Sequence, residues 1–373
     1  MIDRRMLLTG AASLVAGAAG AGRAVAQAAP AQTARTGPRN LITDVPGLKV
    51  GQADDAAVRT GVTVILPDKA AVCAVDVRGG GPATRETDAL SPQNLVQEVD
   101  AIVLSGGSVY GLASGDGVAA WLGAHDRGFQ GLPMPGVPRS PIVPTACLYD
   151  LPNGGKKTWG QEPPYRRLAL RAVEAAGERF RLGTAGAGYG AGSGGLKGGI
   201  GSASVLTPDG VTVGAIVAVN SMGSVVAAGT KKFWAAPLEI GKEFGGLGSA
   251  GLTAAPDDWI NVRPRAQARA NTTIACVATD VALTRVEAQR VAIMAQDGLA
   301  RAIRPIHAPF DGDVVFAIST GRQEAPAAAA IARQFMVARI GALAADTLAR
   351  AIARAVYEAT TWPGSDMKAW RDL

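Results

Sequence analysis

The stretch from Ala268 to Asp280, ARANTTIACVATD, places two threonines after an asparagine, where a polar segment becomes an apolar, β-branched run. A threonine hydroxyl at such a junction could attack the preceding carbonyl carbon and form an ester, whose hydrolysis releases a new N-terminus. The freed α-amine titrates near ~7.7–8.0, so at neutral pH it can accept the proton of its own hydroxyl. Asn271-Thr272-Thr273 is therefore a candidate for this chemistry, and a simple polar lead-in to a strand is the alternative interpretation.

Histidine-based catalysis and zinc binding have few suitable residues in this sequence. The two histidines, His125 and His307, have no partners at metal-ligand spacing, and histidine is not expected to be the catalytic base. The three cysteines, Cys73, Cys147 and Cys276, lie far apart and form no CxxC pair. We therefore expect no zinc site. Two of the cysteines, at 73 and 276, lie in apolar runs and are expected to be small buried side chains.

The elements that must position the junction follow it closely. Ile274 to Thr279 predicts a strand, and Thr284 to Glu287 is a capping box that begins a helix. Asp311-Gly312-Asp313 precedes a predicted strand from Val314 to Ser319, and an alanine-rich helical pattern runs from Pro326 to about Thr360. Two strands and two helices in this order predict one layered half of an α/β sandwich.

The preceding part of the chain also mixes the two kinds of element. Its predicted strands are 62–66, 71–77, 101–104, 202–206 and 211–219, and its predicted helices are 111–122 and 166–180. Pro208-Asp209-Gly210 predicts a hairpin between the last two strands. Proline-rich segments predict loops from Pro133 through Asp150 to Tyr165, and Ala254 to Ala270 predicts an exposed loop open to processing.

The most biased stretch is Gly183 to Gly201, which contains a formal GxGxxG at Gly190, Gly192 and Gly195. No strand leads into these glycines and no helix pattern follows, so a dinucleotide site is not indicated, and Walker A spacing is absent from the sequence. No cofactor is expected. Glycine at this density instead allows close backbone approach and leaves N–H donors unobstructed.

The N-terminal residues predict an export signal. Residues 1–26 combine the Arg4-Arg5 pair, a small apolar run and an A-x-A site at Ala24 to Ala26, which indicates twin-arginine export. The apolar run is shorter than the ~20 residues of a spanning helix, so the mature protein is expected in the periplasm or medium, outside the membrane. Residues 27–39 predict a linker.

The charge of the chain does not indicate a nucleic-acid partner. Loss of residues 1–26 removes three arginines and one aspartate, which lowers the formal charge from +6 to +4. The remaining basic residues are scattered, with no block that alternates with aromatic residues. A nucleic-acid partner is therefore not expected.

Six ordered blocks of the sequence resemble the β-peptidyl aminopeptidase family, which includes the nylon-oligomer endohydrolases. They are RTGVTVIL (59–66), AVDVRGGGPATRETDAL (74–90), IVLSGGSVYGLASGDGVAAWL (102–122), GAIVAVNSMG (214–223), NTTIACVATD (271–280) and PFDGDVVFAIST (309–320). The resemblance implies a four-layer αββα sandwich, related to ornithine acetyltransferase and self-cleaved into two subunits. It also implies a homo-oligomer such as a tetramer.

Carried over residue by residue, the resemblance implies cleavage between Asn271 and Thr272. A large subunit of residues 40–271 and a small subunit of residues 272–373 would stay associated in one catalytic domain. Thr272 would be the nucleophile, because it lies six residues before Ala278-Thr279-Asp280, and Thr273 is the alternative. The chain would then be a self-processing N-terminal threonine amidohydrolase.

The same resemblance implies roles for residues elsewhere in the chain. Asp311 and Asp313 match the acidic pair of the nylon-oligomer branch and would orient the α-ammonium and assist proton transfer. Asn220 would donate to the oxyanion. Lys197 matches an active-site lysine, and Tyr149 is a candidate substrate contact.

One departure from the family pattern bears on the substrate. In the aminopeptidase members that this chain resembles, an acidic residue binds the free ammonium of the substrate. At the corresponding place this chain has Thr145-Ala146-Cys147, with Asp150 nearby. This difference favours cleavage of internal amides in small peptides or ω-amino-acid oligomers. A β-peptidyl aminopeptidase or D-aminopeptidase-esterase, an acyltransferase, and a non-catalytic binding protein on the same scaffold remain alternatives.

Overall fold

The computed structural model describes residues 33–131, 134–256, 271–324, 330–365 and 367–373. The export signal at 1–26, the linker up to residue 32, most of the loop from Ala254 to Ala270 and the expected helix start at Pro326 lie outside the described residues. Residues Ala34–Leu373 form one unit of internal contacts. Among the described helices, none has the length and apolar character that crossing a membrane requires.

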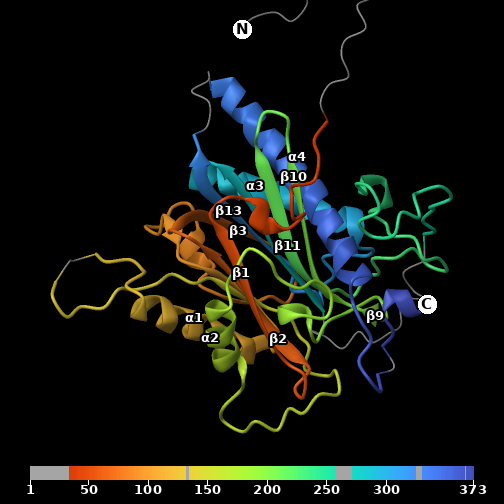
Figure 1. Cartoon of the computed structure of the whole chain (residues 1–373), viewed down its shortest axis with the longest axis horizontal. Coiled ribbons are helices and arrows are strands. Elements are labelled where there is room, and N and C mark those ends of the chain that lie inside the picture. Colours follow the sequence, from red (N-terminus) through yellow and green to blue (C-terminus); the bar gives the residue numbers. More distant parts are fainter. Residues whose placement is uncertain (1–32, 132–133, 257–270, 325–329, 366) are drawn as a thin grey trace, which may run out of the picture. The chain divides into compact units, whose positions relative to one another are not determined.

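Two mixed sheets make up the centre of this unit (Figure 1). Within the described residues, one sheet has the strand order β1-β2-β6-β7-β4 and the other β10-β11-β12-β13-β3-β5. The first contains β1 (Leu48–Asp55), β2 (Thr60–Pro67), β4 (Ala83–Arg85), β6 (Ile102–Ser105) and β7 (Thr145–Cys147). The second contains β3 (Ala71–Val77), β5 (Glu98–Val99), β10 (Gly199–Leu206), β11 (Thr212–Asn220), β12 (Thr272–Val281) and β13 (Val314–Gln323). A small hairpin joins β8 (Gly192–Ser193) and β9 (Leu196–Lys197).

Helices cover the outer face of each sheet. They are α1 (Ala113–Ala124), which follows the 3-10 turn η3 (Ser108–Leu112), α2 (Tyr165–Glu174), α3 (Arg285–Ala302) and α4 (Ala330–Tyr357). Alternate residues of a strand face opposite sides, so Ile216 of β11 packs between the sheets while Val217 packs under α3 and α4. The other sheet packs its outer face on α1 and α2. The expected four-layer αββα sandwich is thus confirmed.

Local signals in the sequence placed several elements correctly. Strands β10 and β11 form the predicted antiparallel hairpin, and Thr284 and Glu287 form the predicted capping box of α3. Cys73 and Cys276 are buried between the sheets, as expected.

Two expectations were wrong because of long-range pairing. Helix α2 ends at Glu174 instead of Phe180, because the chain turns to form a β-bridge between Gly177 and Val50. Thr145–Cys147, expected in a loop, is strand β7, because its backbone pairs with β6 on one side and β4 on the other.

Strand β12 holds the junction in the middle of its sheet. It pairs antiparallel with β11 and parallel with β13, and every one of its residues is buried. Thr272 is its first residue and lies opposite Asn220, the last residue of β11. The strand therefore begins two residues earlier than expected, and the threonines belong to it.

Candidate active site

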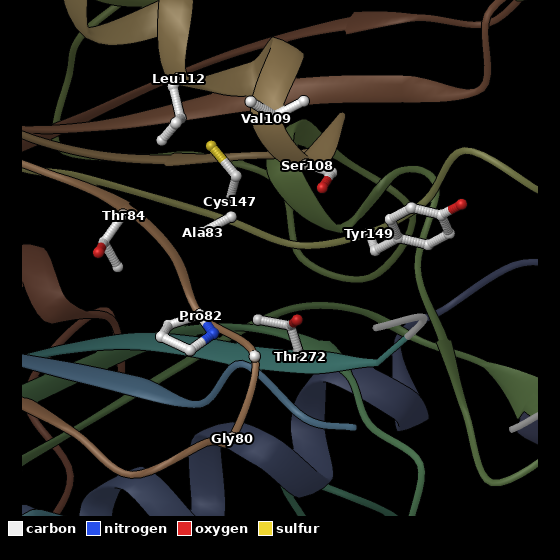
Figure 2. Close-up of a pocket in the computed structure, with 11 residues that line it drawn as sticks. Gly80, Pro82, Ala83, Thr84, Ser108, Val109, Leu112, Cys147, Tyr149 and Thr272 are labelled. Carbon is white, nitrogen blue, oxygen red and sulfur yellow. The ribbon is translucent and has the colours of Figure 1, made fainter. Parts of the chain in front are cut away.

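Thr272 lines a cavity of about 460 Å³ at the end of strand β12. Figure 2 shows Thr272 and Pro82 on one side of this cavity and Leu112 and Cys147 on the other, with Tyr149 beside them. The lining residues are Gly80, Gly81, Pro82, Ala83, Thr84, Ser108, Val109, Leu112, Cys147, Tyr149 and Thr272. The structure thus places a threonine hydroxyl at the wall of a cavity that a small ligand could enter.

The neighbouring Thr273 faces a different environment. Successive strand residues point to opposite faces of a sheet, so Thr273 points away from the cavity that Thr272 lines. Its hydroxyl is buried and has no hydrogen-bond partner among the described residues. Of the two candidate nucleophiles, only Thr272 meets the space in which a substrate could lie.

The carbonyl of Asn271 lies between two hydrogen-bond donors. The Thr272 hydroxyl donates to this oxygen, and the backbone N–H of Gly312 donates to it at 3.1 Å. Gly312 fits so closely that a Cβ on it would lie 2.9 Å from Thr272 Oγ1. The peptide bond before Thr272 is therefore held against its own potential nucleophile, with a backbone donor on the carbonyl oxygen.

Asp311 and Asp313 lie beside this junction and are fully buried. Asp311 accepts hydrogen bonds from the N–H groups of Met222 at 3.3 Å and Ala308 at 3.1 Å. Asp313 accepts one from the N–H of Thr273 at 2.7 Å. These donors offset part of the cost of burying two carboxylates. Both side chains are thus buried in the fold instead of solvated in a surface turn.

The Asp313 carboxylate affects the charge of Asp311. Burial and the nearby Asp313 carboxylate raise the pKa of Asp311 to about 7. The loop after β3 packs tightly on this segment, since a Cβ on Gly79 would lie 2.1 Å from the Asp313 nitrogen. Asp311 can therefore hold or release a proton near neutral pH in a fixed position.

Sequence reasoning missed one residue of this cluster. His307 Nδ1 lies 2.9 Å from Asp313 Oδ2, and the His307 backbone N–H donates to the same oxygen at 3.2 Å. The expectation that histidine has no part as base is not contradicted, but His307 does contact the acidic pair. Its position six residues before Asp313 was the only available signal, and it becomes informative only once the loop is folded.

Asn220 links the junction strand to the cavity wall. Its Nδ2 donates to the Tyr149 carbonyl at 3.1 Å, and its Oδ1 accepts from the Gly192 N–H at 2.9 Å. These bonds orient the amide next to Thr272, which is its partner across the β11–β12 ladder. The structure brings Asn220, Tyr149 and Thr272 together at the cavity.

Lys197 is completely buried, and its ammonium is surrounded by backbone carbonyls. It donates to Ala191 and Gly198 at 2.9 Å and to Gly188 at 3.3 Å. The Trp362 ring lies 4.6 Å from the nitrogen. Burial lowers the pKa of Lys197 to about 7. The hydrogen bonds given for this ammonium in the described part of the chain all go to backbone carbonyls.

Asp150 is buried behind the cavity wall. Its carboxylate accepts from the Thr60 hydroxyl at 2.6 Å and from the Gly107 N–H at 2.8 Å. Burial raises its pKa. No lining residue of the cavity, within the described chain, carries a formal charge, and no cluster of metal-ligating side chains occurs in the described ranges.

Comparisons with known proteins agree with this geometry. The model of peptidase family S58 matches residues 40–369. A protein of Mycobacterium bovis described as an uncharacterized aminopeptidase is 42% identical over 354 residues, which cover 90% of this chain and 98% of that protein. A 6-aminohexanoate-oligomer endohydrolase of Paenarthrobacter ureafaciens is 30% identical over 303 residues, 78% of each chain.

The fold is also similar to a solved structure. The L-aminopeptidase D-Ala-esterase/amidase of Ochrobactrum anthropi, described as a variant of the Ntn hydrolase fold, superimposes with a TM-score of 0.60. It covers 90% of both chains at 20% identity, a likeness of fold. Because the family model spans almost the whole of the described sandwich, the chain belongs to peptidase family S58 and is a hydrolase of that family.

Proposed function

We propose that the chain cleaves itself between Asn271 and Thr272, and that Thr272 then hydrolyses amide bonds as an N-terminal threonine nucleophile. The observation that carries this proposal is the Asn271 carbonyl, which accepts from the Thr272 hydroxyl and from the Gly312 N–H at 3.1 Å. A hydroxyl beside a carbonyl whose oxygen already has a backbone donor is suited to acyl transfer, because the donor stabilises the developing oxyanion.

In the proposed self-cleavage, Thr272 Oγ1 bonds to the Asn271 carbonyl carbon and gives its proton to a base. The carbon–nitrogen bond then breaks, and the nitrogen takes up a proton to become the α-amine of Thr272. Water hydrolyses the resulting ester, which leaves a carboxylate on Asn271 and restores the hydroxyl. We assign the proton transfer to the Asp311–Asp313 pair, since the pKa of Asp311 is raised to about 7.

For substrate hydrolysis, the free α-amine would accept the hydroxyl proton and later donate it to the leaving amine. An acyl group would be carried on Thr272 and released by water. The Asn220 amide, across the ladder from Thr272, is the proposed oxyanion donor. We assign Lys197 a supporting role in the site, where its buried ammonium is held by backbone carbonyls such as that of Ala191.

Intact-mass measurement of purified protein tests the self-cleavage. The wild-type chain should give two fragments that meet between Asn271 and Thr272, and Thr272→Ala should stay a single chain. Thr273→Ala is the matched control and should still be cleaved, because its hydroxyl lies on the other face of the strand. A wild-type chain that remains uncleaved and yet hydrolyses amides would contradict the proposal.

The uncharged cavity supports a neutral acyl group as the part of the substrate that it binds. Asp150 is the carboxylate nearest in sequence to the expected ammonium-binding position, and its oxygens already accept from Thr60 and Gly107 behind the wall. A free ammonium in the cavity would lose water without gaining a carboxylate partner. We therefore favour internal amides of small peptides or ω-amino-acid oligomers, as in the relative named 6-aminohexanoate-oligomer endohydrolase.

An aminopeptidase is the second candidate, because the more similar relative carries that description. The same short oligomer, with a free and with an acetylated N-terminus, separates the two activities. Internal cleavage predicts a kcat/KM for the acetylated oligomer equal to or about tenfold above that for the free one, since no charge must enter the cavity. Refusal of the acetylated oligomer would favour the aminopeptidase.

A further inference from the structure

His307 contacts the acidic pair although it does not line the cavity. Its ring nitrogen Nδ1 lies 2.9 Å from Asp313 Oδ2, and its own backbone N–H donates to that oxygen at 3.2 Å. In the tautomer that carries its hydrogen on Nδ1, the His307 ring donates to this carboxylate oxygen. One oxygen of Asp313 is thus held by a single residue through two donors.

The other oxygen of Asp313 holds the junction strand. Asp313 Oδ1 accepts from the Thr273 N–H at 2.7 Å, so the carboxylate connects His307 to the residue directly after Thr272. Asp311, on the same loop, accepts from Met222 just after Asn220. The loop between α3 and β13 therefore touches the strand ends on both sides of the junction.

The backbone of His307 is in the left-handed region, with φ at 56°. Residues other than glycine adopt this region at a cost, and asparagine, aspartate and histidine do so most readily. Its side chain is 24% exposed, whereas that of Asp313 is fully buried. In this costly backbone conformation the His307 ring points inward and contacts Asp313.

We propose that His307 is a positioning residue: its Nδ1–H holds the Asp313 carboxylate against the Thr273 N–H and thereby fixes the start of β12, with Thr272 at the cavity wall. This inference rests on the proposed role of Thr272 as nucleophile. His307 does not line the cavity, and its two hydrogen bonds to the acidic pair both go to Asp313.

Two substitutions separate the ring donor from the backbone conformation. His307→Gly accepts the left-handed φ and removes the donor, while His307→Asn accepts the same φ and places an amide nitrogen where Nδ1 lies. His125→Asn is the matched control, because the only other histidine of the sequence stacks on Trp121 and bonds its carbonyl on α1. The rate of self-cleavage after synthesis, and kcat and KM of the processed protein on an acetylated oligomer, would be measured for each.

His307→Gly should slow self-cleavage and lower kcat by about tenfold to a hundredfold, the usual effect of losing a hydrogen bond to a charged group. KM should change little, since the cavity lining is intact. His307→Asn should recover most of both rates, and His125→Asn should match the wild type. Circular dichroism would show whether His307→Gly keeps the fold.

Equal rates in the glycine variant and the wild type would overturn the role of His307 alone. So would glycine and asparagine variants that are slowed equally, because the amide donor would then have restored nothing. An uncleaved and inactive wild-type chain would overturn the proposed function and this inference together.

Discussion

At the scale of single residues, the candidate site is a set of buried polar groups with assigned partners. Asp311, Asp313 and Lys197 are all inaccessible to solvent, and each receives or donates at least one hydrogen bond. A buried charge without partners would cost several kcal/mol, so these bonds are a condition of folding as well as of chemistry. The pKa values of Asp311 and Lys197 are both brought to about 7 by burial.

The raised pKa of Asp311 predicts that the free energy of unfolding depends on pH. Its pKa rises from 3.8 in the ordinary case to about 7 in the folded chain, so between these values the folded chain holds a proton that the unfolded chain releases. The contribution of this group to the free energy of unfolding therefore falls as pH rises from about 4 to about 7, by on the order of 2–4 kcal/mol. Asp311→Asn should remove this slope, as measured by urea unfolding at several pH values.

The parent for this comparison is the Thr272→Ala chain, which is expected to stay uncut. Other buried carboxylates with raised pKa values, Asp150 and Asp280, are present in parent and variant and cancel in the difference. The prediction is contradicted if the free energy of unfolding changes with pH equally in the Thr272→Ala parent and in its Asp311→Asn variant. Asp311 would then be ionised at low pH in the folded chain.

At the scale of elements, glycines set how closely the layers approach. A Cβ on Gly201 of β10 would lie 1.8 Å from the Ala351 carbonyl oxygen and 2.7 Å from the Ala355 nitrogen, both in the backbone of α4. Backbone atoms of a long helix cannot move aside as a flexible side chain can. The glycine-rich stretch from Gly183 to Gly201 therefore serves, at this position, to bring a strand against a helix.

Gly201→Ala should lower the free energy of unfolding by about 1–3 kcal/mol through overpacking between β10 and α4. The change can be measured by thermal or urea unfolding. Gly177→Ala is the matched control: no described atom lies within 4 Å of the place that its added methyl group would take, so its stability should stay within about 0.5 kcal/mol of the wild type. Equal stability of both variants would show that α4 shifts without cost.

At the scale of the whole molecule, the proposed subunits share one sheet. Strands β12 and β13, which follow the proposed cut, lie between β11 and β3, which precede it. A buried ion pair adds to this, since Arg350 Nε on α4 lies 2.6 Å from Glu243 Oε1. Separation would break two strand ladders and this ion pair.

The two fragments of a cleaved chain should therefore elute together in size-exclusion chromatography without denaturant. They should separate only when a denaturant unfolds the sheet, because the ladders and the shared core hold them together after the peptide bond is lost. The uncut Thr272→Ala chain is the control for elution position. Spontaneous release of the 272–373 fragment in native buffer would contradict the interleaved arrangement.

The sequence by itself determined the features that depend on neighbouring residues. The β10–β11 hairpin follows from Pro208-Asp209-Gly210, and the start of α3 follows from Thr284 and Glu287, because turns and caps are made by groups a few residues apart. The sequence also singled out Thr272 and the Asp311–Asp313 pair, whose roles stay predictions. The export signal lies outside the described residues and stays a prediction too.

Only the tertiary structure decided which of these groups meet. Thr145–Cys147 became a strand because β6 and β4 supply its hydrogen bonds, and the Lys197 ammonium is surrounded by the backbone carbonyls of Gly188, Ala191 and Gly198. His307 gained its contact with Asp313 through a left-handed backbone that no local pattern indicates. These outcomes depend on how distant segments pair and bury one another. The free energy of a buried polar group is set by its hydrogen-bond partners, and the local sequence alone does not identify these partners.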